Sequence, residues 1–231
     1  MKEQIYTIPV TEAVDKITSE GICTCPMCTL YEKLENDELN LILGASMMEP
    51  DIRIKTNKEG FCRKHFDMML GMKNKLGLAL MMESHIDQVR KSIFPKDGIF
   101  GPKNKCESSI KPLTEHNSSC YICSRVDFHL TKMAETVVFL WNTEEEFAKK
   151  FANIPYFCLE HYRLLLQTGL NKLPKNKQNE FYTAISDIEK KYIDSLYDDV
   201  SWFCKKFDYR YADEPWGNAK DSVERAVKTL S

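Results

Sequence analysis

The sequence lacks long hydrophobic runs and an excess of charge of either sign. Its 231 residues include 32 Lys and Arg against 34 Asp and Glu, which gives a formal net charge of −2. No apolar run reaches the roughly 18 residues that a membrane-spanning helix needs, so no membrane association is expected. A nearly neutral chain also lacks the positive field that drives binding to phosphate backbones, so nucleic acid is not an expected partner.

Common catalytic motifs are missing as well. The chain contains no glycine-rich phosphate loop, no GxSxG nucleophile elbow and no HExxH motif, and it gives no positive indication of an enzyme. The N-terminal residues lack the apolar core of ~7–15 residues that is typical of a signal peptide. We therefore expect a cytoplasmic protein.

Strands are not indicated anywhere, because no segment alternates apolar and polar residues convincingly. Apolar residues instead recur at helical spacing, and the expected fold class is all-α. Thr11 is expected to cap a helix that stops at Gly21, and Thr143 with Glu146 has the spacing of a capping box. Six further helices are expected. The first of them ends at Gly44, the second covers 76–93, and the third covers 130–140. The fourth runs from near Cys158 to Gly169, the fifth covers 179–207, and the last follows Asn218.

What the chain does have is nine cysteines. A protein of this length can bury enough core to fold without disulfides. Thiols in the cytoplasm are kept reduced, so a spaced cysteine pattern there indicates metal binding or catalysis before it indicates disulfides.

Six of the cysteines and two histidines form an internal repeat. A CxxC motif is followed by a CxxH motif, and the same order then recurs 95 or 96 residues later. The first copy consists of Cys25, Cys28, Cys62 and His65, and the second of Cys120, Cys123, Cys158 and His161. Residues 95–119 are rich in Pro, Gly and Ser without apolar periodicity, which is typical of a linker. We expect a first metal-binding module at 1–95, a linker at 96–119, and a second module with the C-terminal helices at 120–231.

The residue types and spacings predict two metal sites. Structural zinc sites commonly combine two short-spaced pairs of Cys and His ligands. In CxxH the two ligands stand at i and i+3, which on a helix places them about 5–6 Å apart on one face. The expected sites follow the repeat, with Cys25, Cys28, Cys62 and His65 in one and Cys120, Cys123, Cys158 and His161 in the other. Four protein ligands leave no open position for a substrate, which favours a structural role.

Other interpretations of the pattern remain open. Three Cys and one His can hold zinc or an iron–sulfur cluster, and the spacing does not decide between them. The CxxC pairs also allow thiol and disulfide exchange, although the βαβ context usual for that chemistry is missing. The cysteines and histidines can also be ordinary buried residues. Cys23, Cys106 and Cys204 have no expected role, and Cys106 is expected to be exposed.

The paired CPxC…GFCxxH-like modules are followed by Lys206-Phe207-Asp208-Tyr209-Arg210 and Glu214-Pro215-Trp216-Gly217. This combination resembles a bacterial family of unknown function, helical and rich in Cys and His. The resemblance covers nearly the whole chain, implies a two-module helical fold and implies no activity. Some members are labelled ABC-transporter substrate-binding proteins, a label that would require export or a lipid anchor, for which this N-terminus gives no signal.

The C-terminal segment from Trp202 to Trp216 is rich in aromatic residues. Its rings and charges can form the wall of a pocket for a protein partner or a small ligand, with Tyr209, Arg210 and Trp216 as contact residues. Alternatively, the segment folds back on the helices with its rings buried and its charges paired, which is the interpretation we favour.

Overall fold

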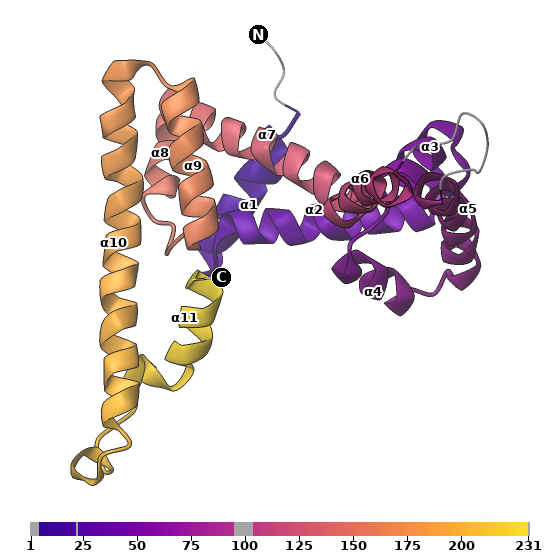
Figure 1. Ribbon diagram of the computed structural model, residues 1–231. Coiled ribbons are helices and arrows are strands. Elements are labelled where there is room, and N and C mark those ends of the chain that lie inside the picture. Colours follow the sequence, from indigo (N-terminus) through magenta and orange to yellow (C-terminus); the bar gives the residue numbers. More distant parts are fainter. Residues whose placement is uncertain (1–4, 22, 95–103, 231) are drawn as a thin grey trace. The chain divides into compact units, whose positions relative to one another are not determined.

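The computed structural model describes residues 5–21, 23–94 and 104–230, and these ranges contain helices and no strand (Figure 1). The expected all-α fold class is therefore confirmed. The α-helices are α1 (Thr7–Glu20), α2 (Pro26–Leu43), α3 (Pro50–Glu59), α4 (Arg63–Gly71), α5 (Lys75–Ile93), α6 (Lys105–Ser118), α7 (Tyr121–Thr143), α8 (Glu145–Phe151), α9 (Leu159–Lys172), α10 (Lys175–Lys205) and α11 (Ser222–Leu230). Short 3-10 helices are η1 (Ala45–Met48), η2 (Tyr209–Tyr211) and η3 (Gly217–Asp221). No helix in the described ranges combines the length and apolar character needed to cross a membrane.

The chain divides into two compact units. The terminal unit comprises residues 1–32 and 130–231, and the central unit comprises residues 33–129, so the division falls within α2 and α7. This differs from the consecutive modules expected at 1–95 and 120–231 with a linker at 96–119. Much of that linker forms α6, which packs against α5 and so belongs to the central unit. Residues 95–103 lie outside the described ranges.

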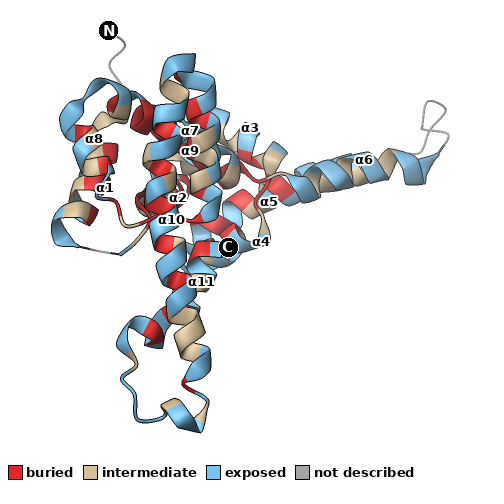
Figure 2. Ribbon diagram, turned by 90° about the vertical axis from the view of Figure 1, so that its left-hand side faces the viewer, coloured by how far each residue is buried: buried red, intermediate tan, exposed pale blue. Residues whose placement is uncertain are grey.

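The core of the terminal unit is aromatic. The ring centroid of Phe151 lies 5.6 Å from that of Phe157 and 6.0 Å from that of Phe181. The rings of Trp141 and Phe181 meet edge to face, with their centroids 5.0 Å apart. Figure 2 shows buried residues along α9 and along one side of α10. On α10 this buried stripe ends at Leu196, and the remainder of the helix is at least partly exposed.

Polar contacts connect three helices of the central unit. A guanidinium nitrogen of Arg53 on α3 donates to the carbonyl of Leu80 at 2.7 Å and to the hydroxyl of Ser84 at 2.5 Å, both on α5. The ring of His85 on α5 donates from Nδ1 to the carbonyl of Asn57 on α3 at 2.9 Å. Ser109 on α6 donates to the carbonyl of Ile93, the last residue of α5, at 2.7 Å. These contacts connect α3, α5 and α6.

Two helix ends follow the sequence signals, and two helix starts do not. Helix α1 stops before Gly21, which has φ 64°, as expected for a glycine in the left-handed region, and α2 stops before Gly44. The expected start at Thr11 is wrong, because α1 begins one turn earlier at Thr7. The expected capping box at Thr143 is also wrong: its hydroxyl donates to the carbonyl of Phe139 within α7, and α8 begins at Glu145.

Gly169 does not end its helix, because α9 continues to Lys172. A Cβ atom at position 169 would lie 2.6 Å from Cδ1 of Phe181 on α10. Phe181 is 1% exposed, and its ring packs against the rings of Trp141 and Phe151, which limits its movement on those sides. The glycine is therefore explained by close packing of α9 on α10.

The close approach predicts that Gly169→Ala destabilises the protein. The added methyl group overpacks the interface, at a cost of about 1–3 kcal/mol in the free energy of unfolding, measured by urea titration. Gly71→Ala is the matched control, since Gly71 is also helical and a Cβ atom added there would meet no other atom within 4 Å. The control should be neutral or stabilising by up to about 1 kcal/mol. A Gly169→Ala protein as stable as the wild type would contradict this account of the packing.

Candidate metal centres

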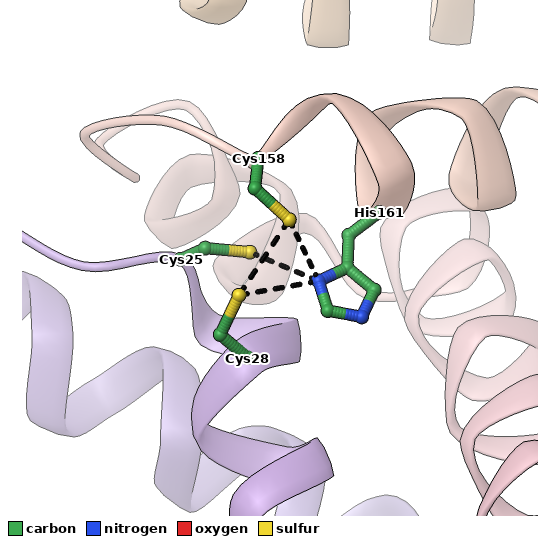
Figure 3. A group of neighbouring side chains, drawn as sticks. All are labelled: Cys25, Cys28, Cys158 and His161. Atoms are coloured by element: carbon green, nitrogen blue, oxygen red, sulfur yellow. Dashed lines mark hydrogen bonds between the residues drawn. The ribbon is translucent and has the colours of Figure 1, made fainter. Parts of the chain in front are cut away.

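The first group of metal-ligating side chains lies in the terminal unit and consists of Cys25, Cys28, Cys158 and His161 (Figure 3). Cys25 directly precedes α2 and Cys28 lies in its first turn, where Pro26 supplies a backbone already suited to the first helical position. Cys158 is the N-cap of α9, and His161 lies in the first turn of that helix. Two helix starts, far apart in sequence, thus provide two side chains each.

The four side chains of this terminal-unit site converge. His161 Nδ1 lies 3.0 Å from Cys158 Sγ, 3.3 Å from Cys28 Sγ and 3.6 Å from Cys25 Sγ. The sulfur atoms of Cys28 and Cys158 are 3.5 Å apart. All except Cys28 are buried. The ring nitrogen of His161 therefore faces all three sulfur atoms.

The second group lies in the central unit and consists of Cys62, His65, Cys120 and Cys123. Cys62 is the N-cap of α4, His65 lies in its first turn, and Cys120 directly precedes α7. His65 Nδ1 is 3.2 Å from the sulfur atoms of both Cys62 and Cys120 and 3.5 Å from that of Cys123. Cys62 and Cys123 Sγ are 3.9 Å apart. This central-unit site repeats the local geometry of the terminal-unit site.

The structure places all eight residues proposed from the sequence in two groups of four. The expected assignment of CxxC to CxxH motifs is wrong. The CxxC motif of Cys25 and Cys28 meets the CxxH motif of Cys158 and His161, which belongs to the other copy. Likewise, Cys62 and His65 meet the second CxxC motif. The physical reason is that the starts of α2 and α9 converge in one unit, and the starts of α4 and α7 in the other. Cys23, Cys106 and Cys204 lie outside both groups and are exposed, as expected for Cys106.

Thiol acidity is uneven in the terminal-unit site. Hydrogen bonds from Cys25 and Cys28, together with others from His161, hold the pKa of Cys158 far below its ordinary value. The hydrogen bond with Cys158 raises the pKa of Cys28 to about 12, and burial raises the pKa of Cys25. Cys158 also lies at the N-terminus of a helix, where backbone N–H groups stabilise an anion.

The central-unit site shows the same pattern. Burial opposes ionisation of Cys62, but hydrogen bonds from the backbone of His65 and from Cys120 and Cys123 outweigh it and lower the pKa of this thiol. Burial raises the pKa of Cys123 to about 12. Because metal ions bind the thiolate form, each group must release protons when it takes up an ion, and its affinity must fall as the pH falls.

The turn into α4 depends on Gly60. This residue has φ 62° and ψ −156°, a conformation that is almost confined to glycine. Its carbonyl accepts a hydrogen bond from the backbone N–H of Tyr121 at 2.9 Å, which ties the Cys62 segment to the start of α7. Gly60 therefore forms the turn that leads into Cys62 and α4.

Two buried carboxylates next to the sites were not found from the sequence. Glu35 Oε1 lies 3.0 Å from Nε2 of His65, and Glu189 Oε2 accepts from the backbone N–H of Phe157, the residue before Cys158, at 3.1 Å. Burial raises the pKa of Glu189. Each acid lies far from its partner in sequence and carries no motif, so nothing distinguishes it from the other acidic residues.

The C-terminal residues proposed to contact a partner have different environments. Tyr209 is 88% exposed, whereas Arg210 is paired with Asp208 at 2.6 Å. Trp216 packs 5.7 Å from Phe203, and the ammonium group of Lys206 lies 5.3 Å from its ring. The favoured interpretation expected buried rings, which is wrong, because every ring from Trp202 to Trp216 is half-buried or exposed. Its paired charges are found for Asp208 and Arg210. A partner at Tyr209, Arg210 and Trp216 stays a prediction.

The whole chain, residues 1–231, matches a family described as a family of unknown function, DUF6062. The chain belongs to this family. The match agrees with the resemblance drawn from the two Cys and His modules, and it likewise supplies no activity for DUF6062. No curated protein and no solved structure matches the chain.

Paired substitutions test which motifs share an ion. Cys25→Ser with Cys158→Ser removes two ligands from the terminal-unit site only, so one ion should remain as resistant to a chelator as in the wild type. Cys25→Ser with Cys62→Ser removes one ligand from each site, so no ion should remain at wild-type affinity. Elemental analysis after dialysis against a chelator counts the ions. The opposite result for the two variants would restore the pairing within each sequence copy.

Proposed function

We propose that this protein is a helical scaffold folded around two zinc ions, one in each Cys3His group. The proposal rests on one observation: in each group the four donor atoms lie within 4.8 Å of one another. In each group they come from two helix starts that are far apart in sequence. In the central unit Cys62 and Cys123 are 61 residues apart, and in the terminal unit Cys28 and Cys158 are 130 residues apart.

The spacing of the donors supports a single tetrahedral ion. Zn–S bonds of about 2.3 Å and Zn–N bonds of about 2.0–2.1 Å require sulfur atoms about 3.8 Å apart and sulfur and nitrogen atoms about 3.6 Å apart. Cys28 and Cys158 Sγ are 3.5 Å apart, and Cys62 and Cys123 Sγ are 3.9 Å apart. The S–N separations run from 3.0 to 3.6 Å, so both groups are at or slightly inside the tetrahedral spacing. In an iron–sulfur cluster the protein ligands bind different iron atoms and stand farther apart, so the compact groups favour one ion each.

A structural role follows from the number of ligands. Three thiolates and one imidazole complete a tetrahedral shell, which leaves no position for a substrate. Zinc binding contributes about 10–16 kcal/mol in small zinc domains, as much as the whole stability of many proteins. All nine cysteines are free thiols, which suits a protein that works in a reducing compartment such as the cytoplasm.

The two sites also support the proposal that the chain contains an internal duplication. In both, the CxxH cysteine is an N-cap and its histidine turns Nδ1 toward the sulfur atoms. In both, the CxxC motif begins one residue before a helix. A duplicated module whose copies exchanged their CxxH partners accounts for this arrangement.

Metal analysis of protein purified without oxygen tests the identity of the ions. We expect two zinc ions per chain and no absorption in the visible range, because zinc has a filled d shell. A brown protein with iron and acid-labile sulfide would contradict the zinc proposal and support an iron–sulfur or redox role.

A cleavable chain tests whether the ions hold the fold together. A protease recognition sequence inserted between residues 98 and 99 would give two fragments, and every site takes two ligands from each fragment. The cut chain should elute as one species from a sizing column and separate when a strong chelator is added, whereas an uncut sample with chelator controls for changes in size. Fragments that remain together without metal would contradict a structural role.

A further inference from the structure

The two sites differ in what lies behind the histidine ring. In the central-unit site His65 is fully buried, with Nδ1 toward the three sulfur atoms and Nε2 3.0 Å from Glu35 Oε1. A carboxylate accepts and does not donate, so the proton of a neutral His65 belongs on Nε2. This leaves the lone pair of Nδ1 directed at the position of a metal ion, an arrangement common among metal-ligating histidines.

Glu35 is held in this position by a second donor. The ammonium group of Lys64 lies 2.5 Å from the same oxygen atom, Oε1. Glu35 is 5% exposed, whereas the side chain of Lys64 is 56% exposed. Charge-assisted hydrogen bonds of this kind are stronger than those between neutral groups. Glu35 thus connects a surface lysine to the buried ring of His65.

In the terminal unit, the position that corresponds to Glu35 in sequence carries an apolar side chain. Aligning the two CxxC motifs places Leu130 opposite Glu35, and Leu130 is 6% exposed and has no acceptor atom. Among the described residues, no carboxylate is paired with Nε2 of His161, whose polar contacts are those of Nδ1 with the sulfur atoms. The same three Cys and one His are therefore supported differently in the two units.

We infer that Glu35 is a positioning residue that fixes His65 as an Nδ1 ligand and raises the metal affinity of the central-unit site alone. This inference rests on the proposed metal binding and goes beyond it, because it makes the two sites unequal. Loss of such an outer carboxylate typically costs 10–100-fold in metal affinity. The two ions should accordingly respond differently to any change at Glu35.

Cadmium-113 NMR of the full chain tests the inference, because each Cys3His site gives its own signal. Chelator titrations compare the wild type with Glu35→Leu, which copies Leu130, and with Glu35→Gln, which keeps the shape and removes the charge. In Glu35→Leu the central-unit signal should disappear at a 10–100-fold lower chelator concentration, with a smaller shift in Glu35→Gln. The terminal-unit signal should not move in either variant.

Glu38→Gln is the matched control, since Glu38 lies on the same helix, is 6% exposed and pairs with Arg125 at 3.0 Å without contacting a ligand. It should leave both signals unchanged. Equal weakening of both signals by the Glu35 variants, or no change in either, would overturn the inference while leaving the proposed function intact. A wild-type chain without cadmium signals would overturn the proposed function and this inference together.

Discussion

The constraint on which the rest of this fold depends is the convergence of helix starts in pairs. A cysteine pair at the beginning of one helix needs a cysteine and a histidine from the beginning of another, and each pair of starts lies within one unit. The central-unit site closes a loop of 61 residues, between Cys62 and Cys123, inside the larger loop of the terminal-unit site. Loop-closure entropy grows slowly with length, so doubling the loop adds only about 0.6 kcal/mol to its cost. A nested arrangement is therefore nearly as accessible as two short, consecutive loops.

The eight candidate ligands could be found from the sequence, whereas their pairing could not. The spacing within CxxC and CxxH is local, and local geometry decides that Cys62 and His65 come together at the start of α4. Which CxxC they meet depends on how α2, α4, α7 and α9 pack. The register of the repeat is the same for both pairings, so Cys25 and Cys120 were equivalent candidates for His65.

The helix ends likewise depend partly on local sequence and partly on contacts with residues far along the chain. The stop at Gly21 is a backbone property of glycine and was predictable. Gly169 carries the same signal, but the ring of Phe181, 12 residues away, requires the missing side chain, and the helix continues. Thr143 had a capping spacing, yet its hydroxyl bonds to the preceding turn of α7. The Ser and Pro residues of α6 predicted a linker. The segment is nevertheless helical, and contacts with α5 support it.

Buried charge is the feature that sequence patterns handle least well, and here two buried carboxylates lie next to the candidate ligands. Glu35, Glu189 and Lys206 are all nearly inaccessible to solvent, and each is held by groups that come together only in the fold. Lys206 donates to the carbonyls of Tyr211, Ala212 and Glu214 and so closes the turn after α10. Glu189 fixes the backbone that leads into Cys158, whereas Glu35 acts on the histidine ring itself. A buried carboxylate that contacts the backbone supports the position of a ligand, and one that contacts imidazole also sets its tautomer and basicity. Two sites with the same four ligands can therefore differ in chemistry because their neighbours differ.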